Sequence, residues 1–426
     1  MEEWGSVMER AHEPQGPIPP PAERGTAHAR ATYLPQPGRS GIALCLSGGG
    51  FRAALFHLGA LRRLNELGVL GRVDTLSAVS GGSIFAAHLI EATPRWPEPG
   101  AIIPAAVWER EVAATFRAFV GTNLRTGPLL KRLLPWNWFR QSTAVDALAG
   151  REAALTRRTL DHLPERPTYI FCATDMVYGT YWVFQRDRIG GGEYVGYRRP
   201  APAWRVARAV AASSCWPPAF DPLPLCLRPS EYTGATENDP ARAAHLAGIS
   251  LTDGGVYDNM GLEPVWNTSA VVLVSDGGGT FHFQTRWNFA RRVLRYQDIV
   301  QHQAREVRKR WLMSNFLQGV LHGTYWSITT KVEHYDLPTA RGYSAALVDD
   351  ILSSIRTDED AFSTAEIAVI ENHGYILANA AVAQHVKELI APDALPFALP
   401  HPEWMDEARV RAALADSGAI RPLGRW

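Results

Sequence analysis

Residues 41–82 carry the pattern that decides the fold, and they read GIALCLSGGGFRAALFHLGALRRLNELGVLGRVDTLSAVSGG. The run 41–46 is short, apolar and ended by glycines, which is typical of a buried parallel strand. Leucine and alanine then recur at helical spacing over 52–68, where a glycine is suited to end the helix. Residues 73–79 predict a second strand and residues 83–90 a second helix. This order predicts a right-handed crossover in a parallel sheet.

Two further apolar runs, residues 168–174 and 270–275, predict that the same sheet resumes later in the chain. The alternation of strands and helices favours a sheet with helices packed on it. The predicted fold class is therefore α/β: a central, mostly parallel sheet flanked by helices, with a helical insertion and a helical C-terminal region.

The chain divides into three predicted parts. Residues 1–38 mix Pro, Ala, Gly and charge, and such a stretch cannot bury enough apolar area to offset its ordering entropy. We therefore expect a disordered or loosely packed tail there. Residues 39–285 form the predicted core, with an insertion at about 91–165. Residues 286–426 are expected to be a helical extension that packs on the core.

Charge and cysteine content limit the class of protein. The 426 residues include 43 Lys and Arg and 43 Asp and Glu, which gives a formal net charge of zero and argues against a dedicated nucleic-acid binder. The four cysteines form no C-x-x-C pair. Cys45 and Cys172 lie in apolar runs, where we expect small buried hydrophobes. This cysteine usage fits a reducing compartment.

Targeting and membrane-spanning segments are not visible in the sequence. The first residues are acidic and polar, unlike a signal peptide. No apolar run reaches the length of about 18 residues that a spanning helix needs. We therefore expect a cytoplasmic protein that meets a membrane, if at all, from the surface.

Ser80 lies at the junction between the second predicted strand and the second predicted helix. A strand that turns sharply into a helix presents a side chain at the carboxyl edge of a sheet, where α/β folds place their sites. The turn must be tight, and its neighbours Ala78, Gly81 and Gly82 are small. The usual elbow is G-x-S-x-G, and here Ala78 replaces the first glycine. The alternative is a plain Ser-Gly-Gly turn.

Three glycines, Gly48, Gly49 and Gly50, separate the first predicted strand from the first predicted helix. Free N–H groups in such a loop can point at an anion, assisted by the helix dipole. A phosphate is disfavoured because the run contains neither G-K-[ST] nor G-x-G-x-x-G, which leaves a tetrahedral oxyanion. Tight packing of helix on strand is the alternative. Arg52 is expected to anchor the loop, to bind a substrate phosphate, or to be solvated at the helix start.

Asp253 is the candidate general base. It ends a strand-like run and precedes Gly254 and Gly255, and a partly buried carboxylate can take a proton from a serine within hydrogen-bond distance. A plain Asp-Gly-Gly turn is the alternative. A Ser-His-Asp hydrolase would instead place a histidine after the acid. The histidines available there, none in a recognisable setting, are His282, His322, His334 and His373.

The glycine run, the Ser80 turn and the Asp253 turn, in this order, resemble the patatin-like phospholipase family. Residues 172–184 are similar to the central strand and hairpin of that family, and residues 206–220 to its Ala-Ser…Pro…Phe segment. The resemblance covers about residues 41–278, with a long insertion. It implies a three-layer patatin-like sandwich that needs no metal and no organic cofactor.

The resemblance also implies a role for each matching residue. Ser80 would be the nucleophile and Asp253 the base of a dyad without histidine. Amides of the glycine loop would form an oxyanion hole, and the residues of that loop are Gly48, Gly49, Gly50, Phe51 and Arg52. The implied substrate is a phospholipid or another lipid ester, cleaved through an acyl-enzyme.

Two other functions stay open at this point. The same dyad could pass the acyl group to an acceptor other than water, or the fold could be a catalytically silent module that binds lipids or a partner. Residues 129–140 mix leucines with Lys131, Arg132 and Trp136, as an element at a membrane surface would. A packed helix with core tryptophans is the alternative. The basic stretch 286–310 is expected to be a solvated helix face, and attraction to a membrane is the alternative.

Overall fold

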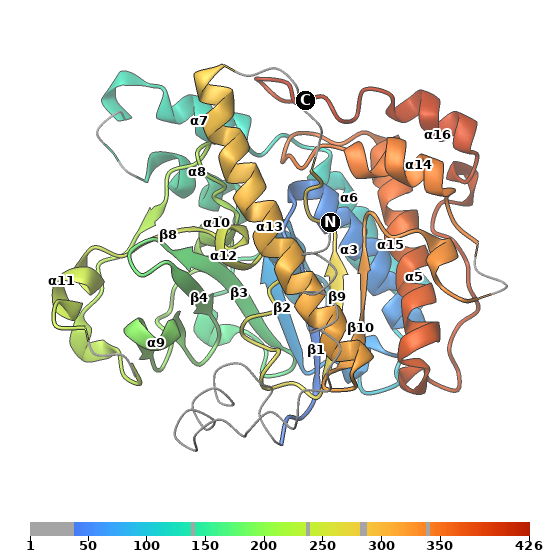
Figure 1. Ribbon diagram of the computed structural model, residues 1–426, viewed down its shortest axis with the longest axis horizontal. Coiled ribbons are helices and arrows are strands. Elements are labelled where there is room, and N and C mark those ends of the chain that lie inside the picture. Colours follow the sequence, from blue (N-terminus) through green and yellow to red (C-terminus); the bar gives the residue numbers. More distant parts are fainter. Residues whose placement is uncertain (1–37, 138–139, 141, 236–238, 282–287, 338–340) are drawn as a thin grey trace, which may run out of the picture.

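A mixed sheet of ten strands forms the centre of the protein and lies between layers of helices (Figure 1). The computed structural model describes residues 38–137, 140, 142–235, 239–281, 288–337 and 341–426. The tail predicted for residues 1–38 therefore lies outside the described residues, apart from Gly38. The predicted α/β sandwich with a central sheet flanked by helices is confirmed.

The sheet runs in the order β10-β9-β1-β2-β3-β4-β5-β6, with β8 paired to β3 and β7 paired to β8. The bounds of its strands are β1 (Ile42–Leu46), β2 (Thr75–Val79), β3 (Thr168–Asp175), β4 (Thr180–Phe184), β5 (Ile189–Gly191), β6 (Gly196–Arg198), β7 (Leu223–Pro224), β8 (Ser250–Asp253), β9 (Val271–Asp276) and β10 (His322–Ser327). The strands from β10 to β3 are parallel, and the remaining pairs are antiparallel. The four strands predicted from apolar runs are β1, β2, β3 and β9.

Alternate residues of β1 belong to two separate cores. Leu44 and Leu46 join the larger apolar cluster, whereas Ala43 and Cys45 join a second cluster on the other face. All four side chains are fully buried. A parallel strand covered on both faces must be apolar at every position, and this is why β1 was visible in the sequence as a continuous run.

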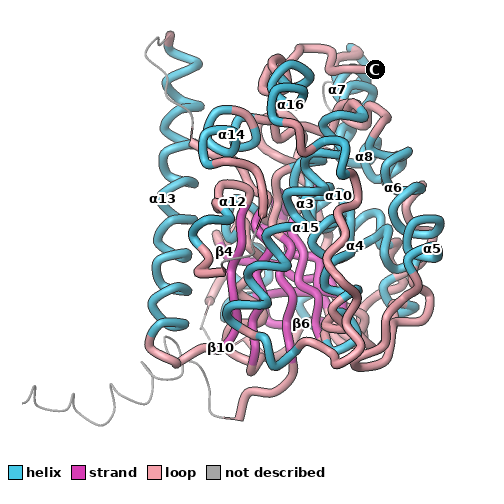
Figure 2. The backbone as a smooth tube through the Cα atoms, turned by 90° about the vertical axis from the view of Figure 1, so that its right-hand side faces the viewer, coloured by secondary structure: helices cyan, strands magenta, loops and turns pink. Residues whose placement is uncertain are grey.

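Helices cover both faces of the sheet. The principal helices have the bounds α3 (Gly50–Glu66), α4 (Gly81–Ala92), α10 (Val206–Ser214), α12 (Gly255–Asp258), α13 (Phe289–Leu317), α14 (Ala345–Asp350), α15 (Thr364–His385) and α16 (Glu407–Leu414). The larger cluster is packed against α3, α4, α10 and α15, while α12 and α13 lie on the opposite face (Figure 2). This arrangement places the carboxyl ends of the parallel strands at one edge of the molecule.

Smaller helices fill the segments between the strands. The insertion predicted at about 91–165 contains α5 (Ala105–Val107), α6 (Ala114–Val120), α7 (Thr126–Arg132) and α8 (Thr143–Glu152). Two more, α9 (Gly192–Val195) and α11 (Arg242–Ala247), lie beyond β5 and before β8 respectively. The structure adds one feature to the predicted helical C-terminal region, because β10 extends the sheet there. Its sequence HGTYWS is not a continuous apolar run, so the pattern did not predict a strand.

Helices α3 and α15 cross with their backbones in contact. A Cβ atom added at Gly59 would lie 1.9 Å from the Glu371 carbonyl oxygen, and one added at Gly374 would lie 2.0 Å from the Phe56 carbonyl oxygen. Neither distance leaves room for a methyl group. The two glycines therefore set how closely α15, which belongs to the C-terminal region, packs against the first helix of the core.

Two expectations from composition can be compared with the structure. Cys45 and Cys172 are buried, as small hydrophobes in apolar strands should be. No helix in the described ranges is both long enough and apolar enough to cross a bilayer.

Replacing Gly59 by alanine is expected to lower the free energy of unfolding by about 3 kcal/mol, because the new methyl group would overlap a backbone carbonyl of α15. The matched control is Gly150→Ala in α8, since nothing lies within 4 Å of a Cβ at that position. That variant should be neutral or slightly stabilised, because alanine favours a helix. Urea unfolding of both proteins measures the difference, and equal stabilities would contradict the packing argument.

Candidate active site

Ser80 occupies the sharp turn between β2 and α4. Its backbone has φ 50° and ψ −119°, and it is the one non-glycine residue with a positive φ in the described ranges. Such strain persists only where the surrounding structure enforces it, often at functional sites. An added Cβ would lie 2.1 Å from the Gly50 oxygen at Gly81 and 2.4 Å from the Leu46 oxygen at Gly82. Only glycine fits at these two positions.

The elbow is held in place from behind by α10. The Ser80 amide donates a hydrogen bond to Ser213 Oγ at 2.9 Å, and the Ser213 hydroxyl donates to the Cys172 carbonyl at 2.6 Å. Ala78 keeps the regular register of β2, so the missing first glycine does not disturb the turn. Ser213 was not predicted as a site residue. The one sequence signal for it is its position within the segment 206–220 that resembles the family.

Asp253 is the last residue of β8, opposite Ala173 of β3. Its side chain is fully buried, and its Oδ1 accepts the Gly255 amide at 2.7 Å. Burial raises the pKa of Asp253 to about 7, although the Gly255 amide and the Ser80 hydroxyl act in the opposite direction. A carboxyl group with a pKa near neutrality can gain and lose a proton during turnover.

The Ser80 hydroxyl faces the Asp253 carboxyl group, since it is one of the groups that shift the pKa of Asp253. Within the described structure, Asp253 Oδ2 is buried and has no partner of hydrogen-bond geometry. The two side chains are therefore close, but no hydrogen bond of good geometry joins them in the described structure. Catalytic hydrogen bonds are often long in unliganded sites and shorten when substrate binds. The fold thus brings together the serine and the acid that the sequence analysis selected.

The turn after Asp253 is joined to the glycine loop. A Cβ at Gly254 would lie 2.4 Å from the Cys172 oxygen, and one at Gly255 would lie 2.5 Å from Asn259 Oδ1. The Asn259 carbonyl accepts the Gly48 amide at 3.0 Å. These contacts fix the distance between the Asp-Gly-Gly turn and the loop that follows β1.

The glycine loop presents free amides beside Ser80. Gly49 and Gly50 have φ values of 135° and 55°, which favour glycine. In the described structure their N–H groups meet no acceptor, whereas Phe51 N–H donates to the Asp358 carbonyl at 2.9 Å. The Phe51 and Gly48 amides, both expected from the sequence as oxyanion donors, are thus engaged elsewhere, since the Gly48 amide donates to the Asn259 carbonyl. Among described residues the Gly81 amide, at the start of α4, also has no acceptor.

Arg52 anchors this loop instead of reaching into solvent. Its side chain is fully buried. The guanidinium group donates to four backbone carbonyls, those of Gly277, Gly278, Ser353 and Ile355. Of the three roles considered for Arg52, the structure supports anchoring.

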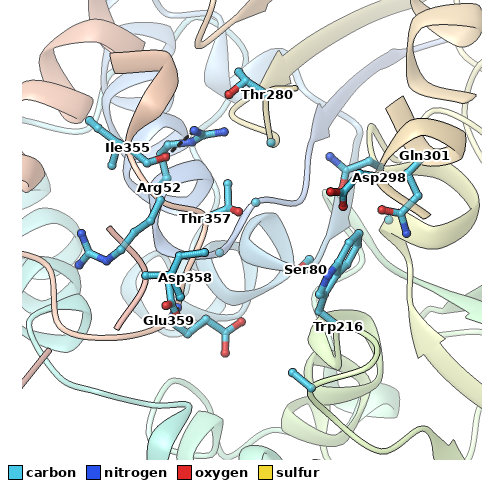
Figure 3. Close-up of a pocket in the computed structure, with 18 of the residues that line it drawn as sticks. Arg52, Ser80, Trp216, Thr280, Asp298, Gln301, Ile355, Thr357, Asp358 and Glu359 are labelled. Carbon is cyan, nitrogen blue, oxygen red and sulfur yellow. Dashed lines mark hydrogen bonds between the residues drawn. The ribbon is translucent and has the colours of Figure 1, made fainter. Parts of the chain in front are cut away.

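A pocket of about 520 Å³ opens above Ser80. Its floor includes Gly49, Gly50 and Asn259, and one wall is formed by Trp216 and neighbouring residues up to Phe220. Figure 3 shows Ser80, Trp216 and Glu359 among the lining residues. The remaining wall comes from α13 and from the segment 354–359, both in the C-terminal region.

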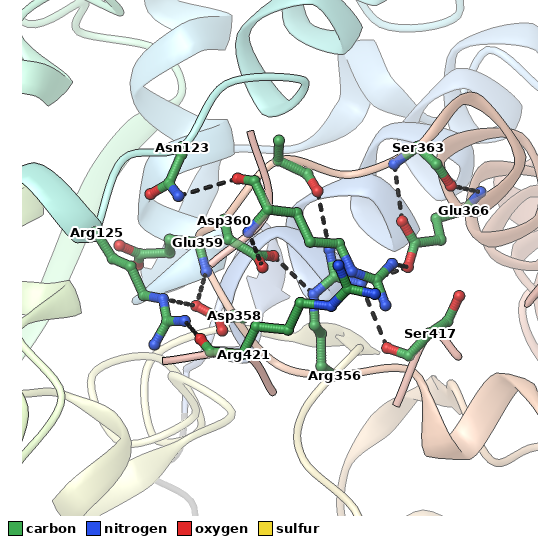
Figure 4. Close-up of polar contacts among 12 residues, drawn as sticks. Asn123, Arg125, Arg356, Asp358, Glu359, Asp360, Ser363, Glu366, Ser417 and Arg421 are labelled. Atoms are coloured by element: carbon green, nitrogen blue, oxygen red, sulfur yellow. Dashed lines mark hydrogen bonds and ion pairs between the residues drawn. The ribbon is translucent and has the colours of Figure 1, made fainter. Parts of the chain in front are cut away.

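An ionic network joins the segment 353–361 to α15 and to Arg125 (Figure 4). Arg356 pairs with Asp360 at 2.6 Å and also with Glu366, and all three side chains are fully buried. Arg125 pairs with Asp358 at 2.8 Å, and the Asp358 carbonyl holds the Phe51 amide. The contribution of this region to the site could not be recognised from the sequence, although the acidic residues that follow Arg356 are visible there.

Glu359 lines the pocket together with Asp298 and Asp358 (Figure 3). Burial, with smaller effects of Asp358 and Asp253, raises the pKa of Glu359 to about 8. Its Oε2 is buried without a hydrogen-bond partner in the described structure. Glu359 is therefore largely protonated at neutral pH, which leaves Asp253 as the group whose charge changes near pH 7.

Two of the four histidines considered earlier have partners away from Ser80. His322 pairs with Glu388 at 2.6 Å, and His373 is buried beside the Ile328 carbonyl. His334 belongs to a short helical turn, and His282 lies outside the described residues. His302 lines the pocket and stacks on Phe281.

The described residues contain no group of three His, Cys, Asp or Glu side chains arranged to hold a metal ion. The groups present at the site, a hydroxyl, a carboxyl and free backbone amides, can perform proton transfer and nucleophilic attack.

Comparison with known proteins places the chain in a family. A family model described as patatin-like phospholipase matches residues 44–266, and no curated protein matches. The chain is similar to human GIVD cytosolic phospholipase A2 in complex with methyl gamma-linolenyl fluorophosphonate, at 14% identity and a TM-score of 0.41, covering 89% of this chain and 59% of that chain. It is also similar to VipD from Legionella pneumophila, at 14% identity and a TM-score of 0.34, covering 89% and 76% respectively. The chain spans 40–59% of the length of the human phospholipase chains that it matches. By the family model, which covers more than half of its residues, the chain belongs to the patatin-like phospholipase family.

Proposed function

We propose that this protein is a lipid acyl hydrolase that cleaves carboxylic esters with Ser80 as nucleophile and Asp253 as general base. The observation that carries the proposal is the strained Ser80 elbow facing a buried carboxyl group whose pKa is raised to about 7. Membership of the phospholipase family supports a lipid ester as the substrate. A pocket of about 520 Å³ leaves room for the scissile ester and the start of its acyl chain.

In the first half-reaction, ionised Asp253 takes the Ser80 proton and Oγ forms a bond with the ester carbonyl carbon. The carbonyl oxygen becomes an oxyanion, which the free amides of Gly49, Gly50 and Gly81 are placed to bind. Removing one such donor typically lowers kcat by about 10²–10³-fold. Because the amides belong to rigid turns, they need no reorganisation as the negative charge develops.

Collapse of the intermediate breaks the bond between the carbonyl carbon and the alkoxy oxygen. The proton held by Asp253 passes to the leaving alcohol, which restores the carboxylate. In the second half-reaction Asp253 takes a proton from water, whose oxygen attacks the acyl-Ser80 ester. A fatty acid leaves, the proton returns to Ser80, and no external redox partner or cofactor enters the balance.

Ser80→Ala and Asp253→Asn are each expected to reduce ester hydrolysis by at least about 10³-fold, because each removes one half of the nucleophile–base pair. Release of fatty acid from phospholipid and from a short-chain ester measures the loss, and a fluorophosphonate probe should label the wild type but not Ser80→Ala.

The matched controls are Ser77→Ala and Asp175→Asn. Ser77 lies on the same strand as Ser80 and donates to the Gly261 carbonyl, and Asp175 accepts the Val177 amide at the end of the neighbouring strand β3. Both controls should keep most of the activity. Full activity in Ser80→Ala with an intact fold would refute the proposal.

The rate of ester hydrolysis should depend on the ionisation of Asp253 and of Glu359. We expect kcat/KM to rise as pH increases through about 7, because only ionised Asp253 can accept a proton. It should fall above about 8, where ionised Glu359 adds a second negative charge near the developing oxyanion. Glu359→Gln should abolish the alkaline fall and keep the acidic limb. A pH profile unchanged by that variant would contradict this assignment.

Asp253 should also make the fold less stable as pH rises. A buried carboxyl group with a raised pKa binds its proton more tightly in the folded state, so between the unfolded pKa near 3.9 and the folded value of about 7 each pH unit costs about 1.4 kcal/mol. Asp253→Asn removes the buried charge. Its stability relative to wild type should therefore increase from pH 5 to pH 8 by roughly 2–3 kcal/mol in urea unfolding.

A further inference from the structure

Large apolar side chains are exposed on both sides of the pocket mouth. On α7 and the turn after it, Leu133 and Trp136 are 67% and 71% exposed, and Leu130 and Leu134 accompany them. On α13, Leu294 is 44% exposed. Scattered apolar residues on a surface need no explanation, but a concentration of them at one opening indicates an interaction site.

The hydrogen bonds and ion pairs of this region place both segments at the mouth. Arg132, at the end of α7, pairs with Asp221 at 2.9 Å and donates to the Ala219 carbonyl, and Ala219 lines the pocket wall. On the other side, Arg295 and Asp298 of α13 line the pocket. Figures 1 and 2 both show α7 and the N-terminal end of α13 at the same end of the molecule, where the parallel strands terminate.

Helix α13 is held rigidly in that position. Arg305 pairs with buried Asp276 at 2.7 Å, and the Tyr325 hydroxyl donates to the same carboxylate at 2.8 Å. This buried contact fixes the middle of α13 to the ends of β9 and β10. The half of α13 that precedes Arg305 lies at the margin of the molecule (Figure 2). Its apolar side chains therefore cannot reach the core.

Basic side chains accompany the apolar ones in these two segments. Lys131, Arg140 and Arg292 are exposed, and they form no ion pair with an acidic residue in the described part of the chain. The protein has no net charge overall, and α13 also carries Asp298 at the pocket, so the positive character of this surface comes from these three side chains. Apolar side chains mixed with cations are the composition that attaches a protein to an anionic lipid surface.

We define the mouth face as the apolar residues Leu130, Leu133, Leu134, Trp136, Leu294 and Ile299 with the basic residues Lys131, Arg140 and Arg292. We propose that the mouth face docks on the surface of an anionic phospholipid bilayer, so that the pocket opens directly onto the lipid. The inference rests on the proposed function, because a lipid ester must leave a bilayer to reach Ser80. It assigns Trp136 to the membrane surface and not to the core.

A bilayer fits this surface better than a second protein does. The apolar side chains come from two elements on opposite sides of an opening, and each element also carries an exposed cation. A protein partner would need a surface that matches both elements and fills the mouth. Insertion into a headgroup layer requires no such match, because side chains enter a fluid surface individually.

The test uses the full chain carrying Ser80→Ala, so that lipid is not consumed during the measurement. Sedimentation with vesicles of equimolar phosphatidylcholine and phosphatidylglycerol should show binding, and vesicles of phosphatidylcholine alone should bind more weakly. Adding Trp136→Asp should weaken binding to the anionic vesicles by about tenfold or more, and adding Lys131→Glu by about fivefold. Equal binding by all three proteins would overturn the proposal.

The matched control is Leu317→Asp. Leu317 is 85% exposed at the opposite end of α13, away from the mouth, so this variant should bind within about twofold of the parent. If Leu317→Asp loses binding as strongly as Trp136→Asp, the mouth face is not the docking surface. If Trp136→Asp instead abolishes a dimer detected by analytical ultracentrifugation, the face belongs to a second copy and the membrane proposal fails.

Activity separates this inference from the proposed function. In the otherwise wild-type chain, Trp136→Asp should leave hydrolysis of a water-soluble monomeric ester unchanged and lower hydrolysis of vesicle phospholipid about tenfold. A wild-type protein that binds vesicles but hydrolyses neither substrate would refute the proposed function and leave the docking surface supported. Equal loss on both substrates would show that Trp136 acts on the pocket, and would refute the docking role.

Discussion

The backbone strain at Ser80 is the constraint on which the site depends. A left-handed φ of 50° at a serine is unfavourable, and it is maintained by the buried strand before it, the buried helix after it and the Ser213 hydroxyl behind it. The same turn lets Gly81 and Gly50 approach with their backbones in contact. Nucleophile and free amides are therefore positioned by one set of packing contacts.

The buried carboxyl groups of the site destabilise the folded state and at the same time support the chemistry. Asp253 and Glu359 are buried without a cationic partner that satisfies them, and burial raises the pKa of both. An ion pair would have stabilised the fold but would have lowered the basicity of Asp253. Elsewhere the protein does pair its buried acids, as Arg356 does with Asp360 and Glu366. Asp253 and Glu359 thus carry a cost in stability that these paired acids avoid.

The C-terminal region is a structural part of the site, although the family model ends at residue 266. The Asp358 carbonyl occupies the Phe51 amide, and Arg52 reaches the carbonyls of Ser353 and Ile355. These contacts leave the amides of Gly49 and Gly50 as the free donors of the loop. The close crossing of α15 on α3 carries the segment 353–361 to this position.

The sequence alone determined the local features, because they depend on neighbouring residues: the apolar strands covered on both faces, the glycine loop, the Ser80 elbow and the Asp253 turn. Pattern could not predict β10, the hydroxyl of Ser213 behind the elbow, the loss of Phe51 as a free amide, or the buried carboxyl of Glu359 in the pocket. Each of these depends on contacts between residues far apart in the chain. Only the tertiary structure decided them, because burial and the direction of a hydrogen bond are properties of packed neighbours and not of spacing along the polypeptide.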